Sequence, residues 1–307
     1  SVILALLFLY GLFQILGIKK LILAGAMPLG LVLLNAYLPS DHIQSPQQQP
    51  NIIIIGIDGL RPDHLAHKGN SPSMAPALNR FLDHSVIYDR TYSPMARTYV
   101  AWMSLLSGHY PVKHGARFNL TSPSQVRTQF DLVEQLKQRN YQTSFAMDER
   151  RFNQIDEAYG FDNIIGPKAG AADALIANNA DLPLVNLLLD QPLSSYILPY
   201  LYLNRAYGKA YNPKRFNEEV INSLATTRPN FLAAHFCMLH WPYTSKKFIA
   251  SDQVDWRGNY NHFMYQAMLL KMDIQFNDFI NRLKHTGRLE NAHVYLFSDH
   301  GESFMLE

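Results

Sequence analysis

Asn51-Ile-Ile-Ile-Ile-Gly-Ile57 is an almost unbroken run of β-branched residues, and the carboxylate of Asp58 follows it directly. An apolar run of this kind is typical of a parallel strand that helices cover on both faces. Ligand sites in such sheets lie beyond the carboxyl ends of the strands. The stretch therefore predicts a buried strand that delivers Asp58 to the edge of the sheet where chemistry is expected.

The same pattern returns near the other end of the chain. His293-Val-Tyr-Leu-Phe-Ser298 predicts a second strand, and Asp299 and His300 come directly after it. Together with Asp58, the two strand ends offer two carboxylates and one imidazole. This set of ligands suits Zn²⁺ or Mn²⁺ and, less well, Ca²⁺ or Mg²⁺. We therefore expect Asp58, Asp299 and His300 to bind a divalent metal.

Helical patterns separate the predicted strands. Thr128 to Asp131 has capping-box spacing and opens a predicted helix that runs to about Arg139, and Tyr141 to Ala146 predicts a further strand. From Leu269 to Leu283, apolar residues recur at the spacing of an amphipathic helix. This alternation predicts an α/β fold built in layers. Residues 167–230 show no clear period, and we expect an excursion there that shapes the substrate pocket.

Residues 1–38 contain two uncharged apolar runs, one on each side of Lys19 and Lys20. Each is just long enough for a bilayer, which needs about 20 residues per spanning helix. A signal peptide is the alternative, but its apolar region is shorter and its basic residues come first. We predict transmembrane segments, with the lysines cytoplasmic. With the lysines cytoplasmic, residues 51–307 are expected on the periplasmic or extracellular side of the cell (inner) membrane. The polar, proline-bearing residues 39–50 predict a linker between the membrane segments and this part.

The composition indicates which kinds of partner the protein binds. The formal net charge is only +2, and charged residues make up 17% of the chain, so the composition does not imply a polybasic surface for nucleic acid. We expect no nucleic-acid partner. The membrane lipid bilayer and an ester of a lipid or glycan are the expected partners. The single cysteine, Cys237, lies in an apolar run and is interpreted as a buried packing residue.

Thr98 begins a predicted helix that ends near Gly108. The N-terminus of a helix offers free N–H groups and a positive dipole end, which favour an anionic phosphoryl or sulfuryl group beside the hydroxyl. The alternative is that Thr98 is only an N-cap. A threonine hydroxyl becomes a nucleophile when a base or a metal lowers its pKa. With the Thr98 oxygen as fourth ligand, the metal site could be tetrahedral.

Several segments follow one another in a characteristic order: Ile53-Ile-Ile-Gly-Ile-Asp-Gly-Leu-Arg-Pro-Asp63, Ser73-Met-Ala-Pro-Ala-Leu-Asn79, Thr98 to Asn119, Leu239-His-Trp-Pro-Tyr243, Lys271-Met-Asp273 and Ser298-Asp-His-Gly-Glu302. In these segments the chain resembles the sulfatase-like family of the alkaline phosphatase superfamily. The resemblance implies a mixed, mostly parallel central sheet sandwiched by helices, in a catalytic domain that spans residues 51–307. Family members usually continue past the position of Glu307, so we expect this domain to be truncated at its C-terminus.

The resemblance also assigns the nucleophile. Counting back from Ser107-Gly-His-Tyr-Pro111, the catalytic position of the family falls on Thr98. In sulfatases that position is a cysteine that is matured to formylglycine, which threonine cannot become. The match therefore points to the relatives that use threonine, such as phosphoethanolamine transferases, lipoteichoic acid synthases and nucleotide pyrophosphatase/phosphodiesterases. A site with one metal, as in lipoteichoic acid synthases, is implied.

By the same resemblance, four residues are expected to bind the substrate: His240, Lys113, His114 and Asn119. For His240 the alternative is a structural histidine beside Trp241, and Lys113 could equally be a solvated surface lysine.

Three functions remain open after this step. The first is a phosphoryl-ester transferase or phosphodiesterase that acts through a Thr98 intermediate on a lipid head group or an envelope glycan. The second is a hydrolase of sulfuric or phosphoric monoesters. The third is a catalytically inactive membrane protein that uses the pocket for binding or assembly.

Overall fold

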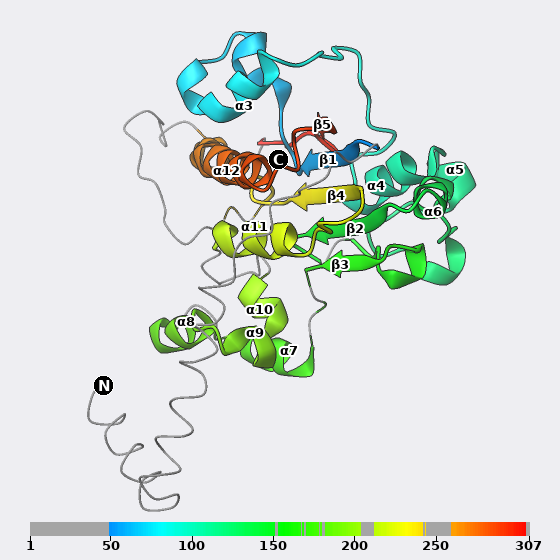
Figure 1. The fold of residues 1–307 in the computed structure, drawn as a ribbon. Coiled ribbons are helices and arrows are strands. Elements are labelled where there is room, and N and C mark those ends of the chain that lie inside the picture. Colours follow the sequence, from blue (N-terminus) through cyan, green and yellow to red (C-terminus); the bar gives the residue numbers. More distant parts are fainter. Residues whose placement is uncertain are drawn as a thin grey trace, which may run out of the picture. The chain divides into compact units, whose positions relative to one another are not determined.

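The predicted strand at residues 51–57 forms the interior of a sheet in the computed structural model (Figure 1). The sheet has five strands in the order β3-β2-β4-β1-β5. Their bounds are β1 (Asn51–Ile57), β2 (Gln142–Met147), β3 (Asn163–Ile165), β4 (Asn230–Phe236) and β5 (Ala292–Phe297). All four strand pairs among the described residues are parallel. The expectation of a mixed sheet is therefore wrong for this part of the chain, where every connection between strands has the length that a parallel crossover requires.

The structure describes residues 49–150, 153–166, 168, 170–177, 179, 182–203, 212–241, 243 and 259–304. The predicted transmembrane segments, residues 1–38, and nearly all of the predicted linker lie outside these ranges. Within them, no helix combines the length and the apolar character that a membrane span requires.

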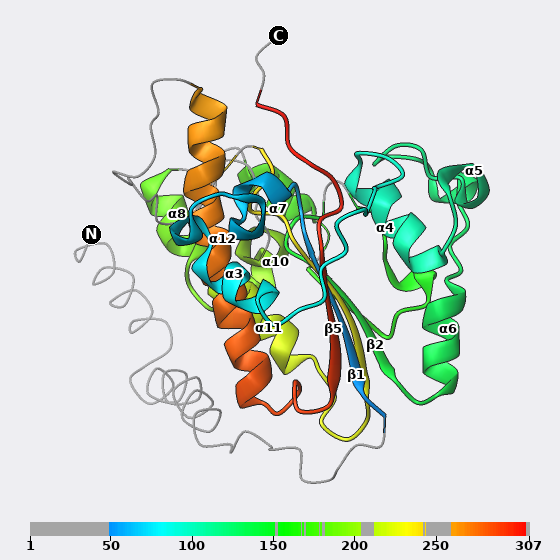
Figure 2. The same cartoon turned by 90° about the horizontal axis from the view of Figure 1, so that it is seen from above.

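Helices cover both faces of the sheet (Figure 2). On one face lie α3 (Pro76–Leu82), α11 (Pro213–Asn222) and α12 (Tyr260–His285), and on the other α4 (Thr98–Ser107) and α6 (Asp131–Gln138). Side chains of β1 alternate between the two cores, since Ile53 and Ile55 pack with the first group and Ile54 with the second. A strand buried in this way has no polar face, which explains its unbroken apolar sequence.

Shorter helices complete the description: α5 (Pro111–His114), α7 (Ala171–Ala177), α8 (Pro183–Leu189), α9 (Ser194–Ile197) and α10 (Pro199–Leu203). Single turns of 3₁₀ helix lie at Pro62–His64, Ala66–Lys68, Pro72–Met74, Pro123–Gln125 and Glu157–Tyr159. The region without a clear sequence period thus contains short helices around a small core of its own.

The capping box predicted at Thr128 does not form. Helix α6 begins at Asp131, and the residue before it, Phe130, makes no side-chain cap. Asp131 instead accepts a hydrogen bond from Arg127 at 2.7 Å. An acidic residue in the first turn still interacts favourably with the helix dipole, which explains why the helix lies where it was predicted although its cap does not.

The indole of Trp102, on α4, packs directly against the sheet at Gly56. A Cβ atom at this position would lie 2.6 Å from Cζ2 of Trp102, a fully buried residue of α4. Glycine is therefore the residue that fits beneath the indole. At its far end α4 stops at Gly108, whose φ of 66° is the left-handed conformation typical of a helix C-terminus. This packing places Thr98, the first residue of α4, at the carboxyl edge of the strands.

Candidate active site

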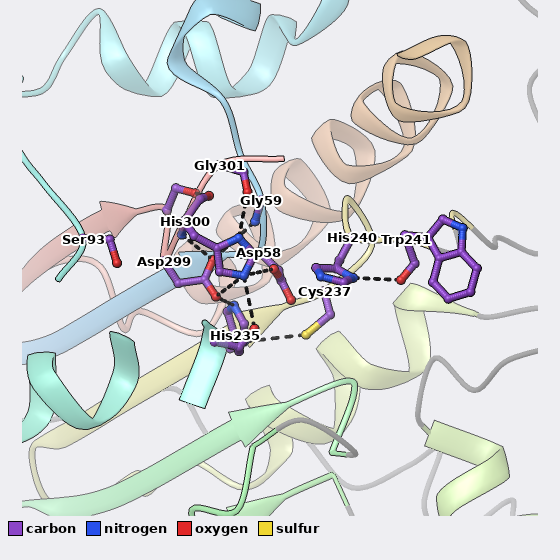
Figure 3. A network of polar contacts seen from close by, with 12 residues as sticks. Asp58, Gly59, Ser93, His235, Cys237, His240, Trp241, Asp299, His300 and Gly301 are labelled. Carbon is purple, nitrogen blue, oxygen red and sulfur yellow. Dashed lines mark hydrogen bonds and ion pairs between the residues drawn. The ribbon is translucent and has the colours of Figure 1, made fainter. Parts of the chain in front are cut away.

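Four of the predicted residues come together at the carboxyl edge of the sheet. Asp58 follows β1, Asp299 and His300 follow β5, and Thr98 opens α4. Nε2 of His300 lies 3.3 Å from Oδ1 of Asp58, 3.5 Å from Oδ2 of Asp299 and 3.3 Å from Oγ1 of Thr98. Figure 3 shows Asp58, Asp299 and His300 converging on one small region. The proximity predicted from strand ends that meet at one edge is thus present.

The backbone around these residues orients them. Oδ1 of Asp299 accepts hydrogen bonds from the N–H of Gly59 at 3.3 Å and from the N–H of His300 at 2.9 Å. Nδ1 of His300 donates to the carbonyl of Gly301 at 2.8 Å, because a carbonyl can only accept. A neutral His300 ring then presents the lone pair of Nε2 to the site, which is the tautomer that a metal ligand needs.

A tyrosine from the opposite layer holds the turn that follows Asp58. The hydroxyl of Tyr265, on α12, donates to the carbonyl of Gly59 at 3.0 Å and accepts from the N–H of Arg61 at 2.9 Å. Tyr265 is fully buried, so both bonds are shielded from water. Helix α12 therefore holds the turn that follows Asp58 in place.

The protonation equilibria of the site are shifted. Burial, together with the negative charge of Asp58, raises the pKa of Asp299 to about 7. Burial lowers the pKa of His300, but the neighbouring Asp299 and Asp58 outweigh it, and the net direction is upward. Both shifts arise from crowding two carboxylates in a space with little water. Such a site favours any cation that can replace the protons.

The donor atoms fit a divalent metal. Oδ2 of Asp299 and Nε2 of His235 are buried, and neither has a hydrogen-bond partner in the described part of the chain. They lie 3.6 Å apart. Two sets of side chains have ligand atoms close enough for one ion: Asp58 with His235 and Cys237, and Asp58 with His240 and His300. Buried polar atoms are normally satisfied, and a metal would satisfy these.

The structure adds His235 and Cys237, which the sequence analysis did not assign to the site. Both lie on or just after β4, a strand that was not predicted. Cys237 is buried, as expected, and its Sγ lies 3.6 Å from Nδ1 of His235. Its N–H donates to Oδ1 of Asp148 at 2.8 Å. The signal was the apolar run from Phe231 to Leu239, in which one imidazole interrupts a strand that is buried throughout.

His240 lies beside the site. Its ring centroid is 5.8 Å from that of His300, and its Nδ1 donates to the carbonyl of Trp241 at 2.8 Å (Figure 3). Lys113 is exposed on α5, and within the described ranges no hydrogen bond or ion pair joins it to the site. A role for His240 in substrate binding fits this arrangement better than a role for Lys113.

His114 and Asn119 have structural partners. Nε2 of His114 lies 2.9 Å from Oγ of Ser104, and its Nδ1 accepts from the N–H of Ala116 at 3.1 Å. With both ring nitrogens bonded inside the fold and 1% of the residue exposed, His114 packs α5 against α4 and does not face a substrate. Asn119 accepts from the N–H of Tyr99 at 3.2 Å and so caps the N-terminus of α4. Because its side-chain oxygen accepts this bond, the amide nitrogen is the atom of Asn119 left to make the predicted contact with a substrate.

A pocket of about 410 Å³ opens beside Asp299, along α4 and the end of β5. Its lining combines aromatic and aliphatic side chains with hydroxyls, among them Tyr92, Ser93, Leu105, Tyr110, Phe297 and Ser298.

The Sulfatase family model matches residues 50–305. No curated protein matches the chain in sequence.

Several solved structures share the fold. A phosphonate monoester hydrolase of Agrobacterium radiobacter is 16% identical with a TM-score of 0.57, over 83% of this chain and 63% of that one. A protein of the alkaline phosphatase superfamily from Vibrio parahaemolyticus is 15% identical with a TM-score of 0.53, over 87% and 58%. A Bacteroides thetaiotaomicron protein, from a core locus for the metabolism of multiple glycosaminoglycans, is 18% identical with a TM-score of 0.57, over 84% and 62%. This chain thus spans 58% to 63% of the length of these three structures.

Proposed function

This chain belongs to the sulfatase family, and on that premise we propose that it is a metal-dependent enzyme that transfers or hydrolyses a phosphoester through a covalent intermediate on Thr98. The observation that carries the proposal is the position of Thr98. Its hydroxyl begins helix α4 and lies 3.3 Å from Nε2 of His300, within a cluster that also contains Asp58 and Asp299. A nucleophile, an anion-binding helix end and a metal-binding cluster therefore share one place.

Asp58, Thr98, Asp299 and His300 would hold the metal, which, when bound, lowers the pKa of the Thr98 hydroxyl and offsets charge on the phosphoryl oxygens. Oγ1 of Thr98 then gives up its proton and forms a bond to phosphorus, while the bond from phosphorus to the leaving oxygen in line with it breaks and the leaving oxygen takes up a proton. The positive end of α4 stabilises the equatorial oxygens. His240, whose ring faces that of His300, is placed to donate a hydrogen bond to the same group.

The second half of the reaction releases the phosphothreonine. Water or an acceptor hydroxyl attacks phosphorus, and Oγ1 of Thr98 leaves and takes up a proton. Hydrolysis and transfer differ only in which of these nucleophiles reaches the site. We favour transfer or phosphodiester cleavage on a lipid head group or an envelope glycan, because threonine replaces the cysteine of sulfatases and because residues 1–38 predict membrane segments.

A monoester hydrolase is the second candidate. The family match favours it, since it covers residues 50–305 under the description Sulfatase. The two candidates differ in substrate and share the nucleophile, so one set of variants tests both.

The experiment measures turnover of bis-p-nitrophenyl phosphate, p-nitrophenyl phosphate and p-nitrophenyl sulfate by the full-length protein with Zn²⁺ or Mn²⁺. Thr98→Ala should reduce phosphoester turnover by at least about 10³-fold, and Thr98→Ser should retain part of it. Ser107→Ala is the matched control, because that hydroxyl lies at the other end of α4 and bonds to the carbonyl of Met103. Peptide mapping after an acid quench should find the phosphoryl group on Thr98.

Preferred turnover of the diester supports the first candidate, and preferred turnover of a monoester or the sulfate supports the second. Full activity of Thr98→Ala would refute the covalent mechanism. A protein without turnover or adduct, although it binds metal, would favour the third function, a binding protein.

A further inference from the structure

His235 lies near the carboxyl end of β4, beside the proposed metal ligand Asp299. Its register partner on β1 is Gly56, which in turn pairs with Phe297 on β5. Side chains at equal register in parallel strands point to the same face, and here that face is the one covered by α4, since Trp102 packs against His235 and Phe297. The missing side chain of Gly56 leaves room for the imidazole. His235 is completely buried there.

The contacts of His235 leave one nitrogen unexplained. Nδ1 lies 3.6 Å from Sγ of Cys237, a normal distance for a weak bond to sulfur. Nε2 faces Oδ2 of Asp299 at 3.6 Å, and neither atom forms a hydrogen bond among the described residues. A direct bond from an imidazole to a carboxylate would be about 2.8 Å long. Two buried polar atoms that face each other beyond bonding distance point to a missing third partner.

The distances suit a shared ion. Neighbouring donors that bind one metal at about 2.1 Å lie roughly 3.0 to 3.5 Å apart, depending on the angle. The pair formed by His235 and Asp299 is 3.6 Å apart, close to this range, and the pairs that His300 forms with Asp58, Asp299 and Thr98 are 3.3, 3.5 and 3.3 Å apart. Figure 3 shows the dashed contacts of His235 and His300 meeting at the Asp299 carboxylate.

We propose that Nε2 of His235 is a further ligand of the metal, a fifth protein donor beside Asp58, Thr98, Asp299 and His300. This inference rests on the proposed function, which supplies the metal site itself. The tautomer it requires has the hydrogen on Nδ1, and Sγ of Cys237 is the acceptor for it. Cys237 is then a positioning residue and its thiol does not bind the ion.

The fifth donor affects which metal the site prefers. With His235 the ligand set contains two imidazole nitrogens instead of one, so it is softer and strengthens the preference for Zn²⁺ and similar transition-metal ions over Ca²⁺ and Mg²⁺.

The test uses the full-length protein, stripped of metal and titrated with Zn²⁺ against a chromophoric chelator. His235→Gln should raise the zinc Kd by at least about 10-fold, while His114→Gln should leave it near the wild-type value. His114→Gln is the matched control for the loss of a buried imidazole, because His114 bonds only within the fold. The Co²⁺-loaded wild type should show no thiolate charge-transfer band, and its d–d bands should change in His235→Gln.

X-ray absorption at the zinc edge decides the question even if His235→Gln does not fold. Two imidazoles should be counted in the wild type and also in His240→Ala, where they can only be His235 and His300. One imidazole in His240→Ala, a thiolate ligand, or an unchanged zinc Kd in a folded His235→Gln would overturn the inference and leave the metal-dependent function in place. A wild type that binds no divalent metal would overturn both.

Discussion

Gly56 makes room for the indole of Trp102 between α4 and the sheet. Because a Cβ atom there would lie 2.6 Å from the buried ring of Trp102, Gly56→Ala forces the indole and the helix to shift. We expect a loss of about 1 to 3 kcal/mol in the free energy of unfolding, measured by urea denaturation.

A double-mutant cycle separates this clash from a backbone effect. Trp102→Phe removes the atom that collides, so Gly56→Ala combined with Trp102→Phe should cost less than the sum of the two single changes. Strict additivity would show that the indole is not what requires glycine at this position.

The pKa of Asp299 gives metal binding a pH dependence. Without metal, Asp299 keeps its proton up to a pH of about 7, and the pKa of His300 is shifted in the same direction. A metal needs both groups deprotonated, so its affinity should rise as the pH increases through 7 and level off above it. Calorimetry in two buffers of different ionisation enthalpy should detect released protons at pH 6. An affinity that is constant from pH 5.5 to 8 would contradict the shift.

Helix α3 depends on a residue of another helix for its N-terminus. Asp273, on α12, accepts hydrogen bonds from the N–H groups of Ala77 and Leu78 at 2.8 to 3.0 Å, and it is buried. Asp273 lies in one of the segments that resemble the family, and its carboxylate caps α3 across the interface between the two helices. Such a cap couples the position of α3 to that of α12.

Removal of this cap should destabilise the fold. Asp273→Ala leaves buried N–H groups without acceptors, and we expect a loss of about 1 to 3 kcal/mol in the free energy of unfolding. Asp273→Asn keeps one acceptor oxygen and should lose less. Asp83→Ala, an exposed change at the other end of α3, is the control and should have little effect. Equal losses in the two changes at Asp273 would argue against the cap.

The proposed metal joins parts of the molecule that are distant in sequence. Its ligands follow β1, begin α4, follow β5 and, with His235, lie on β4. An ion that binds only the folded chain stabilises it by about 2.7 kcal/mol at a free concentration of 100 Kd. For a domain of this size that corresponds to a rise in Tm of roughly 5 to 10 °C. Differential scanning fluorimetry with and without EDTA measures it, and Asp299→Asn should abolish most of the difference. A Tm that does not respond to any divalent metal would contradict the site.

Local patterns in the sequence were enough for the parts of the fold that depend on neighbouring residues. The strands β1, β2 and β5, the part of α12 from Leu269 to Leu283 and the span of α4 from Thr98 to Gly108 were all predicted, because apolar runs, period and glycine position are local properties. The strand β4 was missed although its apolar run resembles that of β1, because the imidazole of His235 interrupts it. Without β4, neither the order of the strands nor the parallel pairing of the described strands could be predicted.

The candidate site likewise contains residues that the sequence could place and residues that it could not. Asp58, Asp299 and His300 could be placed together from the sequence, because residues that follow parallel strands emerge at one edge. The roles of His114 as a packing residue and of Asn119 as a cap could not, because each depends on the donor or acceptor that another element brings near. The same holds for His235, whose imidazole reaches Asp299 only because β4 lies beside β1 at the register of Gly56. Strand ends and helix starts are encoded locally, whereas the partners of a buried polar atom are set by how distant segments pack.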